Sequence, residues 1–315
     1  MKFIKPKIII SKCLEFDACR YDGQLINNEY IRNLKQFIDF HPVCPEVEIG
    51  MGIPREPIRI INNANDILLY QDSSDKNYSE KMNNFSKDFL QSQNNIDGFI
   101  LKSKSPSCAI STSKIYPNKK TKIPIGKGPG LFASEILNQF PNHPKEEEKR
   151  LNNTFLREHF FTSIFTIADY KNVTSIDTLY NYHSKHKYLF MSYNQLLMRK
   201  MGKIAANNVD IPLNELIKNY YEHLLLMFKK RARYTSNINT QMHVLGYFKK
   251  KISAKEKKFF LELIEEYRAK KITLSTVNNV LYSWVVRFDD RYLKKQSYFN
   301  PFPKELAEIN NSRFQ

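Results

Sequence analysis

Short apolar runs divide the first half of the chain into segments of strand length. Three of these runs predict buried strands, over residues 8–10, 42–44 and 98–101. Between the first two, residues 28–40 carry apolar side chains three and four positions apart, a spacing that predicts a helix. Strands that alternate with helical segments indicate an α/β domain.

Three polar or glycine- and proline-rich segments separate the apolar runs of the first half. Residues 71–95 are rich in Asn, Ser, Asp and Lys and predict an exposed amphipathic helix between strands. Gly126–Gly130 could cradle a phosphate, but the segment lacks the Lys-Ser/Thr ending of a nucleotide loop, which favours a plain turn before a helix over 131–140. Residues 141–150 are rich in proline and charge and indicate a hinge, so we place the domain boundary at about residue 150.

The second half has a different pattern. Apolar side chains repeat at helical spacing in three stretches, over residues 213–228, 259–267 and 274–288. Thr273 or Ser275 is available as an N-cap for the last of these helices. Only Gly202 and Gly246 interrupt this half, so we predict an N-terminal α/β domain over residues 1–150 and an all-α domain over 151–315.

Composition adds no membrane signal. Hydrophobic residues make up 42% of the 315 residues and charged residues 26%, which suits two globular domains. No apolar run approaches the roughly 20 residues that span a bilayer, and Met1–Ile10 lacks the apolar core and cleavage site of a signal peptide. We therefore expect a cytoplasmic protein with no membrane partner.

The net charge of +17 is unevenly distributed. Residues 1–160 carry 23 Lys and Arg against 19 Asp and Glu, or +4, whereas residues 161–315 carry 26 against 13, or +13. A basic half indicates acidic partners such as nucleic acid, although a solvated basic surface is the plainer alternative.

Three of the four cysteines follow the predicted strands. Cys13, Cys44 and Cys108 lie just past the strands' C-terminal ends, the edge at which open α/β sheets bind ligands. Proline or small polar residues surround them, and disulfides are rare in the cytosol. The residues alone leave open metal or cluster ligands and structural thiols, with a nucleophile that uses His41 as its base less favoured.

Four strings of residues closely resemble the thiouracil desulfidase family, TudS. They are SKCLEFDACRYDG (11–23), PVCPEV (42–47), GIPREPIR (52–59) and LKSKSPSC (101–108). Residues 140–152 resemble the end of that domain. Residues 182–191 resemble the helical domain that follows it in the two-domain, RudS-type thiouridine desulfidases, so the resemblance covers nearly the whole chain.

The resemblance implies a 4Fe–4S cluster bound by Cys13, Cys44 and Cys108, with one iron left without a protein ligand. Such an iron binds the sulfur of a thiolated uracil, water adds to the ring carbon, and uridine and hydrosulfide leave without net electron transfer. The favoured substrate is 4-thiouridine in tRNA. Alternatives are free thiouracil, a thiolated nucleotide, or a non-catalytic role as an RNA-binding or iron–sulfur sensor protein.

Two further residues occupy positions that the family uses for catalysis. We interpret Glu46 as the base that activates water and Ser105 as a positioning donor or proton relay. The alternative is that Glu46 pairs with Arg55 or Arg59 and that Ser105 caps a turn.

The chain also departs from the family pattern. Family members usually have Gly where Glu15 and Ala109 stand, and a side chain at position 109 requires a negative φ and could tighten the cluster pocket. Cys19 matches a Cys common in the two-domain members, and we interpret it as non-ligating, although it could replace a ligand.

Basic side chains of the second half predict contacts with tRNA phosphates. Five of them are expected on or beside one helix: Lys185, Lys187, Arg199, Lys200 and Lys203. Four more follow the next helix: Lys229, Lys230, Arg231 and Arg233. No obligatory protein partner is inferred. His183 and His186 share a helix face, but without a third ligand nearby they favour a structural or RNA-contacting role over a metal site.

Overall fold

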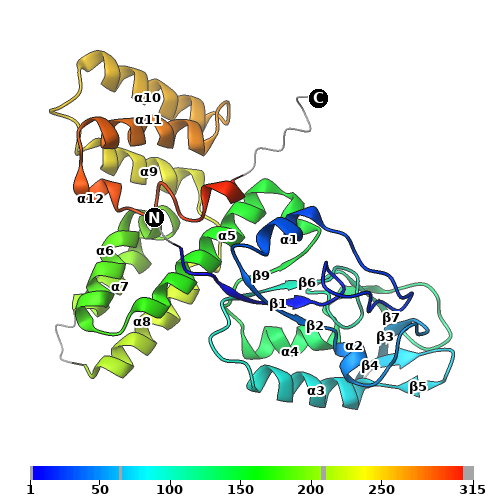
Figure 1. Ribbon diagram of the computed structural model, residues 1–315. Helices are drawn as coiled ribbons and strands as arrows, with labels where there is room; N and C mark the ends of the chain where they lie inside the picture. The colour runs from blue at the N-terminus through cyan, green and yellow to red at the C-terminus, as the bar shows by residue number, and fades with distance from the viewer. Residues whose placement is uncertain (1–2, 64–65, 207–210, 308–315) are drawn as a thin grey trace. The chain divides into compact units, whose positions relative to one another are not determined.

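The computed structural model describes residues 3–63, 66–206 and 211–307, and the chain divides into two compact units, Met1–Ala168 and Asp169–Gln315 (Figure 1). All strands of the described residues lie in the first unit, and the second is helical. The expected fold class, an α/β domain followed by an all-α domain, is confirmed. Helix α5 (Thr154–Asp169) lies in the first unit except for its last residue, so the division falls later than the expected position.

The first sheet is parallel throughout and forms the centre of the α/β unit. Its order is β2-β1-β6-β9, made by Asp39–Val43, Lys7–Ser11, Gly98–Leu101 and Lys145–Glu147. The three predicted strands are therefore confirmed as β1, β2 and β6. Ile8, Ile9 and Ile10 are fully buried, which fits a central strand covered on both faces.

Strand β9 overturns the interpretation of residues 141–150 as a hinge. The segment joins the edge of the first sheet beside β6, and Glu146, Glu147 and Glu148 are buried. Their charges suggested an exposed linker. In the structure, hydrogen-bond donors from other parts of the unit surround the last two carboxylates.

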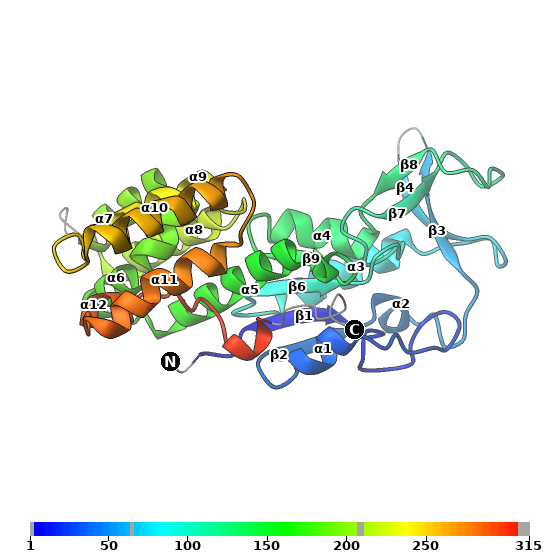
Figure 2. The ribbon, with the colours of Figure 1, turned by 90° about the horizontal axis from the view of Figure 1, so that it is seen from above.

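A second, mixed sheet was not predicted from the sequence. Its order is β5-β4-β3-β7-β8, made by Lys76–Asn77, Asp66–Gln71, Ile58–Asn63, Ser113–Tyr116 and Gly126–Gly128. Strands β3 and β7 run parallel, and the other neighbours are antiparallel. Figure 2 shows this sheet projecting from the body of the unit.

The predicted helices of the first unit are present, but two of them are shorter than expected. Helix α1 covers only Glu29–Leu34 of the predicted 28–40, because the chain turns into β2 at Asp39. Helix α3 covers only Ser79–Gln91 of the predicted 71–95, because the start of that segment belongs to strands β4 and β5. Helix α4 (Leu131–Gln139) follows strand β8 and agrees with the predicted 131–140. Helix α2 (Pro45–Glu48) is a single turn directly after Cys44.

The second unit contains seven α-helices among its described residues. They are α6 (Ile176–Tyr193), α7 (Gln195–Ala206), α8 (Leu213–Met227), α9 (Tyr234–Leu245), α10 (Ala254–Arg268), α11 (Leu274–Arg287) and α12 (Arg291–Lys294). The three predicted helices are confirmed as α8, α10 and α11, and Thr273 caps α11 by accepting a hydrogen bond from the Thr276 N–H. In the part of the chain that the structure describes, no helix combines the length and apolarity needed to cross a membrane.

Candidate active site

Buried thiols gather at the carboxyl edge of the first sheet. Cys44 follows β2 directly, Cys13 lies just past β1, and Cys108 lies on the loop after β6. Because β2, β1 and β6 are parallel neighbours, these ends meet at one edge, as the sequence predicts. The exposed fractions of Cys13, Cys44 and Cys108 are 9%, 8% and 6%.

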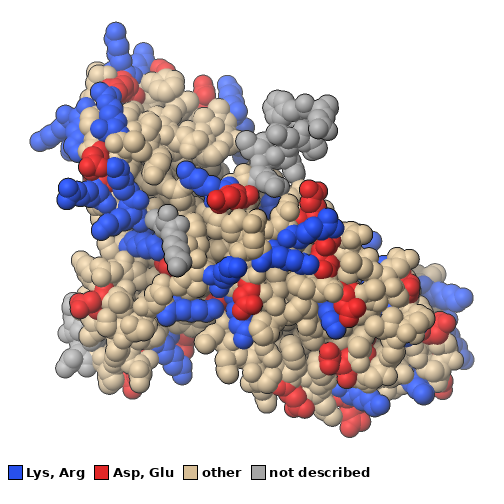
Figure 3. Space-filling view, in the orientation of Figure 1, with Lys and Arg blue, Asp and Glu red and all other residues tan. Residues whose placement is uncertain are grey.

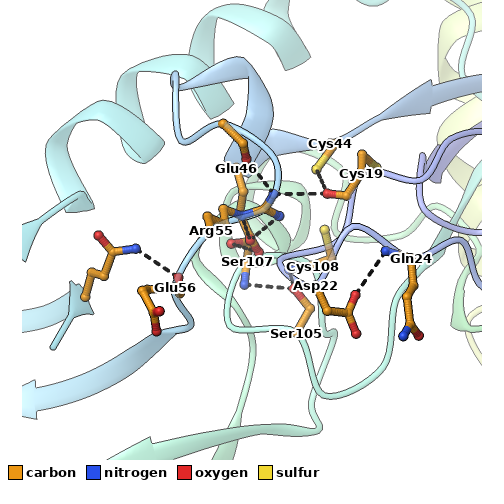
Figure 4. A network of polar contacts seen from close by, with 12 residues as sticks. Cys19, Asp22, Gln24, Cys44, Glu46, Arg55, Glu56, Ser105, Ser107 and Cys108 are labelled. Atoms are coloured by element: carbon orange, nitrogen blue, oxygen red, sulfur yellow. Dashed lines mark hydrogen bonds and ion pairs between the residues drawn. The ribbon is translucent and has the colours of Figure 1, made fainter. Parts of the chain in front are cut away.

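Cys19 belongs to the same group. Its side chain is fully buried and lies within hydrogen-bonding reach of the Cys13 and Cys44 thiols, and the Cys44 thiol donates to the Cys19 carbonyl (3.7 Å; Figure 4). The hydrogen bond with Cys13 and burial raise the pKa of Cys19 to about 11. The hydrogen bond with Cys44 lowers the pKa but does not cancel this rise. Contact with Cys19 and burial also raise the pKa of Cys44. Both stay protonated at neutral pH unless a metal cation binds them.

Cys108 is surrounded by hydroxyl groups. Burial raises the pKa of its thiol, and hydrogen bonds with Ser11 and Ser105 oppose that rise. The Ser105 Oγ also accepts hydrogen bonds from the backbone N–H groups of Ser107 (3.2 Å) and Cys108 (3.0 Å). Ser105 therefore caps the turn that carries Cys108, which was one of the two sequence interpretations, and it contacts the sulfur as well.

Glu46 forms a buried ion pair in the structure. Its Oε2 accepts from Nε (2.9 Å) and Nη2 (2.6 Å) of Arg55, and its Oε1 accepts from the Ser107 hydroxyl (2.9 Å; Figure 4). The exposed fractions of the two charged side chains are 13% and 6%. The alternative pairing foreseen for Glu46 is thus present with Arg55, whereas Arg59 pairs with Asp72.

Arg55 links three segments around the thiols. Its Nη1 donates to the carbonyls of Cys19 and Gly52, both at 3.0 Å, and its backbone N–H donates to the Tyr21 carbonyl. Burial disfavours the guanidinium charge, but the Glu46 carboxylate outweighs it and raises the pKa of Arg55. Arg55 therefore keeps its charge and fixes both the Cys19 loop and the Glu46 carboxylate.

Two consecutive carboxylates hold the loop that carries Cys108. Glu147 accepts from the N–H groups of Ile110 (2.9 Å) and Ser111 (3.0 Å) and from the Thr112 hydroxyl (2.8 Å). Glu148 accepts from the N–H and hydroxyl of Ser103 and pairs with Lys102 at 2.9 Å. The loop is thus anchored on both sides of Cys108.

The start of helix α4 binds this same loop. The N–H groups of Gly130, Leu131 and Ala133 donate to the carbonyls of Ala109, Pro106 and Ser107. A Cβ on Gly130 would lie 2.4 Å from the Ser107 carbonyl carbon, so only glycine allows this close approach. These donors are occupied by protein carbonyls, which disfavours a phosphate cradle at the start of α4. The plain-turn interpretation is wrong for Gly126–Gly128, which forms strand β8 against β7.

Glu15 and Ala109, the two positions that depart from the family pattern, differ in backbone strain. Glu15 has a φ of +69°, in the left-handed region that favours glycine. Its carboxylate accepts from the Asn28 N–H and from Arg32 (3.0 Å), which ties the strained residue to helix α1. Ala109 is fully buried and is absent from the positive-φ residues of the described chain, so its Cβ causes no backbone strain.

The thiols do not meet at a single point. Among the residues that the structure describes, no three His, Cys, Asp or Glu side chains lie close enough together to hold one metal ion. The assignment of Cys13, Cys44 and Cys108 as ligands remains a prediction.

Comparison with known proteins identifies the first unit. Residues 8–148 match the family model described as 2-thiouracil desulfurase, and residues 187–303 match a protein family of unknown function, DUF1722. The uncharacterized protein YbbK of Bacillus subtilis (strain 168) is 32% identical over 108 residues, which are 32% of this chain and 72% of YbbK. The chain belongs to the 2-thiouracil desulfurase family.

Two further similarities accompany this family match. The uncharacterized protein YbgA of Escherichia coli (strain K12) is 28% identical over 133 residues, covering 41% of this chain and 76% of YbgA. A solved structure named [4Fe-4S]-dependent thiouracil desulfidase TudS is 25% identical, with a TM-score of 0.37 over 47% of this chain and 94% of that one. Membership of the 2-thiouracil desulfurase family makes the chain a desulfidase.

The predicted RNA-binding residues of this desulfurase lie on more elements than expected. Lys185 and Lys187 lie on α6, but Arg199, Lys200 and Lys203 lie on α7, because the chain breaks at Asn194, whose side chain accepts from the Leu197 N–H. The prediction of one helix is therefore wrong. Lys185 pairs with Asp169 at 2.6 Å, so the Asp169 carboxylate partly neutralises its positive charge.

The remaining four basic residues lie between α8 and α9. Lys229, Lys230, Arg231 and Arg233 are all exposed. On the face drawn in Figure 3, Lys and Arg side chains gather over the part of the second unit that contains α10, α11 and α12, with fewer over α7 and α8. Their exposure leaves them accessible to phosphates, and RNA binding itself stays a prediction.

Both histidines of α6 contact other side chains of the second unit. His183 Nδ1 lies 2.9 Å from the Tyr220 hydroxyl, and burial lowers the pKa of His183 to about 4. His186 is buried between Ser297 (2.7 Å) and Asp169 (2.9 Å). The His183 ring is half-buried and the His186 ring is buried, and their protein partners favour the structural role over a contact with RNA.

Sequence reasoning missed Arg55, Ser107, Glu147 and Glu148 as parts of the site. Arg55 and Ser107 stood inside the strings that carried the family resemblance, but only Arg55 was considered, as a competing partner of Glu46. Glu147 and Glu148 stood in a charged run, where no local pattern separates buried from exposed carboxylates.

Proposed function

We propose that this chain removes the sulfur of a thiolated uracil by hydrolysis, at a 4Fe–4S cluster held by Cys13, Cys44 and Cys108. The observation that carries the proposal is the convergence of buried thiols with Glu46 and Ser105 at one sheet edge. When bound, the cluster supplies an iron with an open position, a soft Lewis acid for a thiocarbonyl sulfur.

The donor set suits such a cluster. Thiolates are the usual ligands of iron–sulfur clusters, and a polynuclear cluster bridges ligands that do not meet at one atom. Hydroxyls of Ser11 and Ser105 at the Cys108 sulfur favour its charged form. Arg55 adds a fixed positive charge beside the site.

Glu46 is the proposed base. The Arg55 guanidinium occupies Oε2, while Oε1 receives one hydrogen bond from Ser107. A carboxylate oxygen can accept two hydrogen bonds, so Oε1 keeps the capacity to take a proton from water. The ion pair and the base role are therefore compatible, with Arg55 fixing the direction of the carboxylate.

Ser105 is the proposed positioning donor. Its Oγ accepts two backbone N–H groups, which fixes the oxygen, and its own hydrogen is available to the Cys108 sulfur. These contacts favour positioning over a proton relay. The role predicts that Ser105→Ala acts through the geometry and electronics of Cys108.

Anaerobic purification and turnover test this assignment. The full-length protein should contain about four irons, each of Cys13→Ala, Cys44→Ala and Cys108→Ala should lose most of the iron, and Cys19→Ala should keep it. Glu46→Gln should retain the cluster and lose about 100-fold or more in turnover, the range expected for removal of a general base. Zinc at full occupancy without iron, or normal turnover of Glu46→Gln, would contradict the proposal.

We further propose 4-thiouridine in tRNA as the substrate. The surplus charge of +13 in residues 161–315 and the exposed cations of α7 and the α8–α9 connection support an RNA substrate. After cluster reconstitution, incubation with bulk tRNA should release hydrosulfide and deplete 4-thiouridine in the nucleoside digest. Action on free thiouracil or thiolated nucleotides alone would reject tRNA while keeping the chemistry.

A further inference from the structure

The second sheet of the first unit ends in a strongly basic segment. Residues 113–128, which we name the basic arm, contain five lysines and no Asp or Glu. All five are exposed: Lys114, Lys119, Lys120, Lys122 and Lys127. The basic arm was not singled out by the sequence, because the net charge of the first half is small.

Most of these lysines lack a counter-charge. Lys119 pairs with Asp75 at 3.1 Å. Within the described ranges, no acidic side chain forms an ion pair with Lys114, Lys120, Lys122 or Lys127. Four uncompensated cations on one short segment produce a local positive potential that attracts an anionic polymer.

The basic arm also exposes apolar surface. Ile123 and Ile125 are 75% and 61% exposed, among the highest values for large apolar side chains within the described residues. Large exposed apolar side chains beside charged ones are typical of interaction surfaces. In a nucleic acid, riboses and bases offer apolar faces between the phosphates.

Internal contacts hold the basic arm in one conformation. Arg59 of β3 donates to the carbonyls of Lys119 and Thr121 (3.0 Å for Thr121) and lies 5.1 Å from the Tyr116 ring centroid. The Asn118 side chain accepts from the N–H groups of Lys120 and Thr121, both at 2.9 Å. A pre-formed surface loses less conformational freedom when it binds a partner.

The basic arm is continuous with the candidate active site. Strand β7 begins shortly after Cys108, and its parallel neighbour β3 begins shortly after Arg55, with Ile60 paired to Ile115. The sheet leads away from the segments that carry the thiols (Figure 2). A polymer with one base at the thiols could therefore follow this sheet within the same unit.

We propose that the basic arm binds the sugar–phosphate backbone of the RNA that carries the thiolated base. The inference rests on the proposed function and adds a binding surface in the catalytic unit, separate from the cations of the second unit. Its lysines neutralise phosphates and its isoleucines contact riboses or bases. RNA is favoured over an anionic membrane as the partner, because the basic arm adjoins a site that is proposed to bind a nucleobase.

Binding of bulk tRNA to the full-length protein tests the proposal without depending on turnover. The test variant replaces Lys114, Lys120, Lys122 and Lys127 by Gln. The matched control replaces four exposed lysines of the same unit that lie outside the basic arm by Gln: Lys5, Lys81, Lys87 and Lys149. Both variants lose the same charge, so only the location differs.

We expect the test variant to bind tRNA at least about tenfold more weakly at about 100 mM salt, with the control close to wild type. The log–log salt slope should become shallower by about 3, since each phosphate contact contributes about 0.7 to 0.9. Replacing Ile123 and Ile125 by Ser should weaken binding without changing the salt slope.

Three results would overturn the proposal. The first is equal tRNA binding by the test variant and the control. The second is a test variant that loses binding to phosphatidylserine vesicles but keeps tRNA binding, which would assign the basic arm to membranes. The third is self-association of the test variant, detected by light scattering, while its tRNA binding stays intact. This result would show that the lysines only prevent the edge strand β8 from pairing with another copy of the chain. Failure of the wild type to desulfurate any substrate would refute the proposed function and leave the binding result standing.

Discussion

Glu147→Ala tests whether one buried carboxylate orders the Cys108 loop. The side chain is 1% exposed and receives three hydrogen bonds, from two backbone N–H groups and the Thr112 hydroxyl. Removal leaves these donors without their acceptor and opens a cavity next to β9. The perturbation is local, since all three donors lie within residues 110–112.

The magnitude follows from those contacts. Hydrogen bonds to a charged group contribute about 1.5–3 kcal/mol each, and unpaired buried donors cost about 1–3 kcal/mol. Water can reach the exposed Ser111, which lowers the sum, so we expect Glu147→Ala to destabilise the first unit by about 3 kcal/mol. Glu147→Gln keeps one carbonyl oxygen for the two N–H groups and should cost about 1 kcal/mol.

Hydrogen–deuterium exchange is the suitable assay. The single tryptophan, Trp284, lies in the second unit, so its fluorescence does not report the first. Peptides that contain residues 105–112 should lose protection in Glu147→Ala and retain most of it in Glu147→Gln. Glu56→Ala, which removes an exposed carboxylate, is the control. Unchanged protection of this loop in Glu147→Ala would refute the anchoring role.

Three further outcomes follow from single positions. Glu15→Gly should be more stable than Glu15→Ala by about 1 kcal/mol in urea unfolding, because both lose the contacts with α1 but only glycine relieves the positive φ; equal stability would contradict the strain. Gly130→Ala should cost about 1–3 kcal/mol and reduce iron content, because its Cβ displaces the Ser107 backbone; full iron retention would argue against this. Burial lowers the pKa of His183 from 6.5 to about 4, so between these values the unfolded chain binds a proton that the folded chain does not, and stability falls as pH falls. His183→Gln should flatten this loss between pH 6.5 and 4.5 in urea titrations, and an unchanged pH slope would refute it.

The sequence predicted the parts of the site that depend on local pattern. Short apolar runs ending in cysteines located three parallel strands, and the convergence of Cys13, Cys44 and Cys108 followed from the geometry of a parallel sheet. Cys19 was interpreted as non-ligating but able to replace a ligand, and its burial against the Cys13 and Cys44 thiols leaves both roles open.

The parts that sequence analysis missed depend on contacts between distant residues. Glu147 and Glu148 bind donors 35 to 46 positions earlier in the chain, so their charged string looked like an exposed hinge. The second sheet pairs β3 with β7 across more than 50 residues, and neither strand carries an alternation strong enough to identify it alone. The end of α6 and start of α7 at Asn194 could be recognised only from the hydrogen bond that the Asn194 side chain accepts from the Leu197 N–H.

The position of β9 in the chain has a consequence for the order of folding. Strand β9 is the last strand of the first unit, yet its end supplies the carboxylates that anchor the loop around Cys108. During synthesis Cys13, Cys44 and Cys108 all emerge before these anchors exist, and pairing of distant segments is slow. We therefore expect Cys108 to reach its final position only after residues 145–148 have joined the sheet. A cofactor that needs all three thiols would then be inserted late, into a unit whose core has already formed.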